Sequence, residues 1–185
     1  MSPGQIIKTF KSKKGNAVVF RNTKTDDLEM MLSYINILIA EDTFIGLYGE
    51  PLGRDEEEKT LREILDGIEK HDKVFIVVEI NGAYIGNAGI HREKTRRKQH
   101  VGNIGISLIA EYRDEGIGAE LLTSLISEGK NLDLKLLYLT CLENNNRALH
   151  LYEKLGFKRC GYIPNACFWK DGYVGEVTLY LSLVK

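Results

Sequence analysis

The 185-residue sequence has little of what marks several specialised classes of protein. Its three cysteines, Cys141, Cys160 and Cys167, are an odd number without the paired spacing of a structural metal site, so we expect no metal and a reducing cytoplasm. No apolar run approaches the roughly 20 residues of a membrane helix. Residues 1–16 also lack the long apolar segment of a secretory signal. We therefore expect a cytoplasmic protein with no membrane partner.

Neither sign of charge is in excess. The chain has 25 Lys and Arg against 26 Asp and Glu, a net charge of −1, so no overall field attracts nucleic acid. The strongest basic run, HREKTRRKQH at 91–100, has five Lys or Arg in ten residues but no aromatic side chains on which bases stack. We interpret this run as a solvated hairpin and expect no nucleic-acid partner.

What the sequence does contain is the composition of an ordinary globular domain, with 43% hydrophobic and 28% charged residues. The length fits one domain, which we expect to cover residues 1–185 with an ordered core from about residue 16. Strand-like runs are expected at 16–22, 74–90, 101–110, 135–142, 157–163 and 174–184. Asn81-Gly82 is a strong hairpin signal and divides the run at 74–90 into two strands.

Helical spacing of apolar residues alternates with these runs. It predicts a helix after Thr25 and Asp26, a second over Leu61–Ile68, a third after Gly118 and a fourth at 146–155. Residues 43–58 are expected to form an irregular loop. The order β-α-α-β-β-β-α-β-α-β-β predicts an α+β fold of three layers, with a mixed, mostly antiparallel central sheet of six to seven strands and helices on both faces.

The stretch AEYRDEGIGAELLTSLI, residues 110–126, places two glycines directly before a strongly helical run. Glycine inside a helix costs about 1 kcal/mol relative to alanine, so Gly116 and Gly118 indicate that something approaches the backbone closely. The first turn of a helix has unpaired N–H groups and a partial positive charge, which suit a phosphate. The spacing matches neither the P-loop nor the dinucleotide fingerprint. A capped helix after a glycine-rich connection is the alternative.

A second stretch, ENNNRALHLYEKLGF at 143–157, places Asn145 and Tyr152 on one stripe of a predicted helix, two turns apart. Two structural alternatives stay open for these residues. Asn145 suits the N-cap position of that helix. Tyr152 suits a half-buried core aromatic whose hydroxyl finds a partner.

Together the two stretches resemble the GNAT superfamily of N-acetyltransferases. The family signature R/Q-x-x-G-x-G/A appears as Arg113-x-x-Gly116-x-Gly118, and the later signature appears as Asn145, Ala148 and Leu151–Phe157. The two occur in the family's order, about 30 residues apart, and the predicted element order matches the family fold. The resemblance implies an acetyl-CoA-dependent acyltransferase that acetylates a primary amine of an amino acid, a polyamine, a peptide or a protein.

By this resemblance, acetyl-CoA lies in a V-shaped opening between the strands at 101–109 and 135–142. The backbone of Ile106, Ser107 and Leu108 would pair with the pantetheine arm, and Asn145 would orient the cofactor chain. The backbone amides that would hold the pyrophosphate belong to Arg113, Asp114, Glu115, Gly116, Ile117 and Gly118. Lys154 would add charge near the phosphates, with a solvated surface lysine as the alternative.

The implied chemistry is direct acyl transfer from a thioester to a neutral amine. Tyr152, protonated at neutral pH, would act as catalytic acid on the departing thiolate, and the Leu108 amide would stabilise the oxyanion. Cys141 lies in an apolar strand, which favours direct transfer over an acetyl-cysteine. The base stays unassigned, because water and several residues on or beside the central strands qualify: Glu79, His91, Glu93, His100 and Asn103.

The alternative function is a non-catalytic acyl-CoA-binding or regulatory module of the same fold. Release of thiol from acetyl-CoA in the presence of an amine would distinguish the two. We expect the acceptor to meet the irregular region 34–58, whose acidic residues suit a cationic amine, although those at 55–58 equally suit the solvated start of a helix. The sequence does not identify the acceptor and leaves open whether the chain is a monomer or a homodimer.

Overall fold

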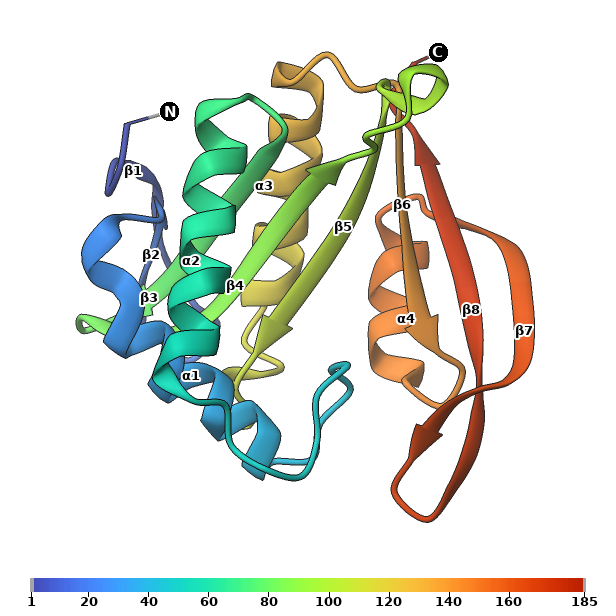
Figure 1. Ribbon diagram of the computed structural model, residues 1–185, viewed down its shortest axis with the longest axis horizontal. Coiled ribbons are helices and arrows are strands. Elements are labelled where there is room, and N and C mark those ends of the chain that lie inside the picture. The colour runs from blue at the N-terminus through green and yellow to red at the C-terminus, as the bar shows by residue number, and fades with distance from the viewer. Residues whose placement is uncertain (1, 185) are drawn as a thin grey trace. The chain divides into compact units, whose positions relative to one another are not determined.

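The computed structural model describes residues 2–184, in which four α-helices accompany eight strands (Figure 1). The helices are α1 (Leu28–Ala40), α2 (Arg54–Glu69), α3 (Ile117–Asn131) and α4 (Asn146–Lys154). The strands are β1 (Ile6–Lys11), β2 (Ala17–Asn22), β3 (Lys73–Ile80), β4 (Ala83–Arg92), β5 (Val101–Leu108), β6 (Leu136–Leu142), β7 (Lys158–Trp169) and β8 (Gly172–Ser182).

The strands form a sheet with the order β1-β2-β3-β4-β5-β6-β8-β7. β1, β2, β3 and β4 pair antiparallel in sequence, and β8 pairs antiparallel with both β6 and β7. β5 runs parallel to β6, with Val101–Asn103 opposite Leu136–Tyr138. The mixed, mostly antiparallel sheet is therefore confirmed, but its count of eight strands corrects the prediction of six to seven.

The additional strand is β1, which precedes the first predicted strand. Its side chains are exposed or half-buried along its whole length, and Ile6 is among the most exposed apolar residues. An edge strand of this kind has no buried face, so it lacks the alternating apolar pattern by which strands are recognised.

The second helix also begins earlier than predicted. α2 starts at Arg54, inside the expected loop 43–58, because Glu56 accepts a hydrogen bond from the Gly53 N–H (3.1 Å) and caps the first turn. The acidic residues at 55–58 therefore belong to a helix start, where negative charge is favourable.

The described residues divide into two compact units. The first unit comprises the chain up to His91 together with Gly105–Leu125, and the second comprises Arg92–Ile104 and the chain from Ile126 onward.

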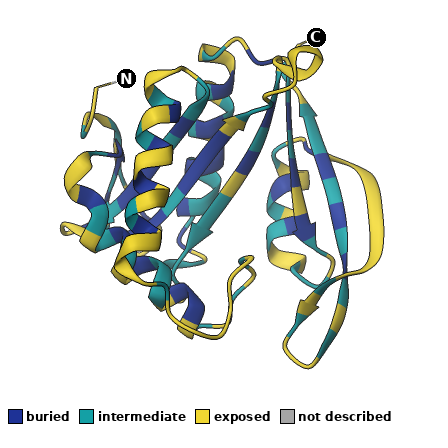
Figure 2. Cartoon of the chain, viewed as in Figure 1, coloured by how far each residue is buried: buried dark blue, intermediate teal, exposed yellow. Residues whose placement is uncertain are grey.

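In the first unit, helices cover both faces of the strands (Figure 1). α1 and α2 pack on one face through a cluster that includes Tyr34 and Leu61 and reaches Val77 and Tyr84 of the sheet. The first half of α3 lies on the other face, where Ile117 is fully buried. Figure 2 shows the pattern expected for amphipathic helices, with buried positions on β3 and β4 and an exposed outer face on α2.

The hairpin that joins β3 and β4 has the predicted turn. Asn81 (φ 51°) and Gly82 (φ 78°) both have positive φ, as a two-residue type I′ turn requires. The turn fixes the register in which Val77 and Tyr84 face the helices.

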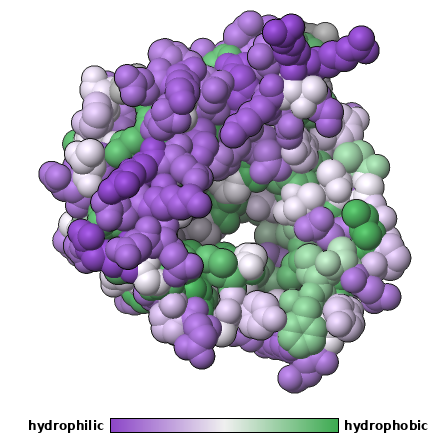
Figure 3. Space-filling view, viewed as in Figure 1, coloured by the Kyte–Doolittle hydropathy of each residue, from purple (hydrophilic) through white to green (hydrophobic). Residues whose placement is uncertain are grey.

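In the second unit, α4 lies beside β6 and buries Leu149 and Tyr152. β7 is exposed along most of its length, and a bulge interrupts its pairing with β8 between Ile163 and Cys167. Apolar surface gathers on this hairpin, where Ile163 and Phe168 are exposed (Figure 3).

Candidate functional site

The loop before α3 turns sharply at Gly116, whereas Gly118 lies inside the helix. A short 3-10 turn at Ala110–Tyr112 leads to Arg113, and Asp114 (φ 66°) and Gly116 (φ 84°) then adopt left-handed conformations before the helix begins at Ile117. A left-handed conformation costs glycine nothing, whereas it strains most other residues. The first amides of α3 therefore follow a sharply turned loop whose backbone carries no side chain at Gly116.

The Glu115 side chain points into the first unit and leaves only its backbone to a ligand. Its carboxylate is 2% exposed and accepts hydrogen bonds from the Ser12 hydroxyl (2.6 Å) and the Asn16 amide (2.9 Å), and it pairs with Lys14 (3.2 Å). These contacts, led by the Ser12 hydroxyl, lower the pKa of Glu115. The negative charge of Glu115 is thus balanced by the β1–β2 turn.

The same turn brings lysines that the sequence analysis did not assign. The Lys13 N–H donates to the Glu115 carbonyl (2.9 Å), and a Cβ placed on Gly116 would lie 3.6 Å from Lys13 Cε. Lys13 was missed because the ordered core was expected to begin at about residue 16. The signal was present in the sequence as KSKKGN, a basic turn at 11–16.

Arg113, the first residue of the glycine signature, turns toward α1. Its Nη2 donates to Glu41 Oε2 (2.6 Å) and its Nε donates to the Leu108 carbonyl (2.8 Å). Glu41 is one of the acidic residues in the region 34–58 that were expected to suit a cationic acceptor. Its carboxylate accepts hydrogen bonds from the Ala110 N–H and from Arg113.

The end of β5 is fixed by a chain of polar contacts. The Tyr34 hydroxyl donates to Ser107 Oγ (2.7 Å), which donates to Asn87 Oδ1 (3.3 Å), and Asn87 donates to the Tyr84 hydroxyl (3.2 Å). Burial raises the pKa of both tyrosines, so both stay protonated at neutral pH. Ser107 therefore uses its side chain to hold the strand.

Asn145 and Tyr152 lie on α4 in the second unit. Asn145 is the N-cap, since its Oδ1 accepts a hydrogen bond from the Ala148 N–H (3.2 Å), and the structural alternative for this residue is thus confirmed. Tyr152 is 7% exposed, its ring packs 5.9 Å from that of Phe157, and burial raises its pKa. Its hydroxyl makes no hydrogen bond within residues 2–184. Lys154 is exposed in the last turn.

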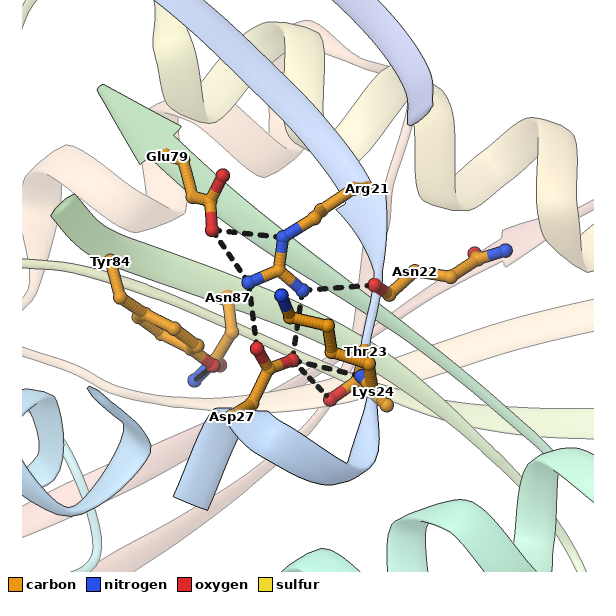
Figure 4. A network of polar contacts seen from close by, with 8 residues as sticks. All are labelled: Arg21, Asn22, Thr23, Lys24, Asp27, Glu79, Tyr84 and Asn87. Atoms are coloured by element: carbon orange, nitrogen blue, oxygen red, sulfur yellow. Dashed lines mark hydrogen bonds and ion pairs between the residues drawn. The ribbon is translucent and has the colours of Figure 1, made fainter. Parts of the chain in front are cut away.

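The structure narrows the list of candidate bases. Glu79 accepts two hydrogen bonds from Arg21 (2.9 and 2.6 Å), and Arg21 also forms a bidentate pair with Asp27 (2.8 Å each; Figure 4). Glu93 accepts a hydrogen bond from the Tyr138 hydroxyl (2.5 Å). Both carboxylates thus hold the fold together, and His91 and His100 are exposed.

Cys141 is buried in β6, and burial raises the pKa of its thiol to about 11, so the thiolate needed for nucleophilic catalysis is disfavoured. Over residues 2–184, His, Cys, Asp and Glu side chains form no group of three that could hold a metal ion. None of the described helices is both long enough and apolar enough to cross a membrane.

The sequence matches one protein family and named relatives. A model of the acetyltransferase (GNAT) family matches residues 39–157. An N-alpha-acetyltransferase from Sulfurisphaera tokodaii is 24% identical over 172 residues, which cover 87% of this chain and 91% of that protein.

Solved structures share the fold. An N-acetyltransferase from Staphylococcus aureus Mu50 has a TM-score of 0.80 at 25% identity, covering 90% of this chain and 99% of that chain. A Salmonella typhimurium protein solved with its cofactor acetyl-CoA has a TM-score of 0.79 at 18% identity, covering 92% of this chain and 96% of that chain. The strand and helix arrangement described above is therefore a known one.

Proposed function

Since the chain belongs to the acetyltransferase (GNAT) family and is an acetyl-CoA-dependent acyltransferase, we propose that it transfers the acetyl group directly to a primary amine. We further propose that residues 1–185 work as a single acyltransferase domain. The match of the family model to residues 39–157, which include parts of both units, supports this proposal.

The residues of the first unit fit the anionic end of acetyl-CoA. The start of α3 carries the positive end of a helix dipole, and the three atoms nearest to the position of a Gly116 Cβ all belong to the Lys13 side chain. Glu115 adds no free negative charge there, because Ser12, Asn16 and Lys14 take up its carboxylate. In our proposal the backbone amides of 113–118 hold the pyrophosphate, and Lys13 contributes a cation beside them.

Three further groups have proposed roles in binding the cofactor. The backbone of Ile106, Ser107 and Leu108 pairs with the pantetheine arm, a role supported by the anchoring of Ser107 through its side chain. Asn145 orients the cofactor chain through its amide nitrogen, since its oxygen caps α4. Lys154 adds charge near the phosphates and is the weakest member of the set, because its place in the last turn of a helix also suits a surface lysine.

Acetyl-CoA supplies the activated thioester. The neutral amine nitrogen attacks the carbonyl carbon, the C–N bond forms and the C–S bond breaks, while the amine proton leaves to water or a base. In our proposal the Leu108 N–H stabilises the negative charge that develops on the carbonyl oxygen.

Tyr152 is the proposed proton donor to the departing thiolate. Its raised pKa keeps it protonated at neutral pH, and its hydroxyl is not engaged in a hydrogen bond within residues 2–184. The resulting tyrosinate regains its proton from water. Cys141, which lies in the same unit, has a thiol pKa of about 11, which supports direct transfer rather than a covalent acetyl-enzyme.

For the acceptor we favour an α-amine over a lysine ε-amine. The relative from Sulfurisphaera tokodaii is named as an N-alpha-acetyltransferase, and its similarity covers most of both chains. An α-amine, with a reference pKa near 8, is also easier to deprotonate than a lysine amine near 10.4, so it needs less help from a base. The three unpaired cysteines support a place in the reducing cytoplasm.

A screen of acceptors tests the proposed function. Thiol release from acetyl-CoA is followed with amino acids, polyamines, aminoglycosides and peptides whose α-amine is free or blocked. We expect release with a free α-amine and none with the blocked peptide. Binding of acetyl-CoA without release for any amine would instead support the alternative, a non-catalytic acyl-CoA-binding module.

A further inference from the structure

Glu41 stands at the end of α1, where a negative charge is unfavourable. It is the C-cap residue of a helix whose last turn contains no basic side chain. The carbonyl end of a helix carries a partial negative charge, so an acidic residue there is normally disfavoured. A residue that breaks a local rule in this way needs a compensating contact elsewhere in the fold.

The compensating contacts all come from the segment between β5 and α3. Glu41 Oε1 accepts a hydrogen bond from the Ala110 N–H (2.7 Å), and Oε2 accepts one from Arg113 Nη2 (2.6 Å). The side chains of Glu41 and Arg113 are 20% and 25% exposed. Short charge-assisted hydrogen bonds between half-buried groups are stronger and more directional than a surface ion pair.

Three consecutive residues are fixed at their backbone, two of them through Glu41 and Arg113. Arg113 Nε donates to the Leu108 carbonyl, the Ile109 N–H donates to the Ile85 carbonyl (3.1 Å), and the Ala110 N–H donates to Glu41. The Arg113 N–H then donates to the Ala110 carbonyl (3.2 Å) and closes the turn. One carboxylate thus joins the end of β5 to the start of the loop at 113–118.

We propose that Glu41 is a positioning residue for acetyl-CoA, which acts through Arg113 and Ala110 to hold both the β5 end and the loop before α3. This inference rests on the proposed cofactor site at 106–118. It assigns the Arg113 side chain to this bridge rather than to a phosphate, so the contribution of Arg113 to the ligand comes from its backbone amide.

A double-mutant cycle separates the bridge from a direct phosphate contact. Glu41→Ala, Arg113→Ala and the double variant are titrated with CoA by calorimetry, and the KM values for acetyl-CoA and acceptor are measured. We expect each single variant to weaken CoA binding by about tenfold and the double variant to lose no more than either single one. The KM for acetyl-CoA rises, while that for the acceptor stays near the wild-type value.

Two controls keep the result interpretable. Glu29→Gln breaks an ion pair with Arg54 (2.9 Å) at the other end of α1 and should leave CoA binding unchanged. Where a melting curve shows that Glu41→Ala is unfolded, Glu41→Gln takes its place, since it keeps an acceptor for the Ala110 N–H but loses the charge that holds Arg113.

The possible outcomes are distinct. If the losses of CoA affinity in the two single variants add up in the double variant, Glu41 and Arg113 act independently. That result would overturn the bridge. Unchanged CoA binding in Glu41→Ala would overturn the bridge, and tighter binding would overturn it in favour of a phosphate contact by the released Arg113. A wild-type protein that does not bind CoA would instead refute the proposed cofactor site.

Discussion

The loop before α3 and the helix α4 hold their key residues by different kinds of contact. Before α3, two side chains of the loop are engaged by charged or polar partners: Glu115 by the β1–β2 turn and Arg113 by Glu41. On α4, Tyr152 is held by apolar packing against Phe157 and has no hydrogen bond to its hydroxyl within residues 2–184.

The difference fits two separate tasks. A network of hydrogen bonds and ion pairs fixes backbone amides in place. Recognition of a charged, non-reacting group requires amides that are fixed in this way. Apolar burial raises the pKa of a phenol and keeps it protonated, which is what a proton donor requires. Changes before α3 should therefore alter binding, whereas a change at Tyr152 should alter the rate.

The largest effect is expected for Tyr152→Phe, which removes the hydroxyl and retains the ring. The loss of a general acid typically costs 10²–10⁴-fold, so kcat should fall by about that factor. Steady-state kinetics with a working acceptor measures it, together with single-turnover kinetics, because slow product release would mask a change in the chemical step. Tyr173→Phe, at an exposed tyrosine of β8, is the matched control. A rate within about threefold of wild type would remove the acid role from Tyr152.

An intermediate effect is expected for Glu115→Ala, which removes the hydrogen bonds and the ion pair between the loop before α3 and the β1–β2 turn. We expect weaker CoA binding and a Tm several degrees lower. Because hydrogen bonding lowers the pKa of Glu115, its stabilisation is present above the ordinary value of 4.5 and is lost as the pH falls through its folded-state pKa. Melting curves of both proteins should therefore converge in acid. A Tm difference that is the same at every pH would contradict this account.

The smallest effect is expected for Glu57→Gln on α2, away from both regions. Burial raises the pKa of Glu57, so the folded protein holds this proton more tightly than the unfolded chain, and the ionised form costs stability at neutral pH. The neutral glutamine should raise the Tm by a few degrees at pH 8. The gain should shrink as the pH falls toward the ordinary value of 4.5. A lower Tm at pH 8 would show that the charged form is favourable.

Much of the fold follows from local sequence signals. The Asn81-Gly82 turn, the helix that stops before Gly156 and the apolar strand β6 depend on neighbours within a few residues, so periodicity and turn chemistry predict them. β1 was missed because an exposed edge strand has no buried face to produce a pattern.

The candidate site was harder to predict because its support is non-local. The glycine signature identified the loop at 113–118, but nothing near Arg113 in the sequence indicates that Glu41, 72 residues earlier, holds it. Lys13 reaches Gly116 in the same way, through the pairing of β1 with β2. The side chains that position a loop come from whichever elements the sheet brings beside it, and a single sequence does not reveal that order.

A Gly116→Val variant tests whether the start of α3 binds CoA, but it needs a control for backbone strain. Gly116 has a φ of 84°, which a valine tolerates poorly. Gly82→Val places the same strain (φ 78°) in the β3–β4 turn, where nothing lies within 4 Å of the new Cβ. This variant should bind CoA like the wild type.

The most direct test is a calorimetric titration of CoA into Gly116→Val and Tyr152→Phe, side by side. If the start of α3 holds the pyrophosphate and Tyr152 acts only in the chemical step, Gly116→Val weakens binding by about tenfold or more, because its side chain occupies the approach to the amides. Tyr152→Phe then binds CoA within about twofold of wild type. Wild-type affinity in folded Gly116→Val would contradict the account.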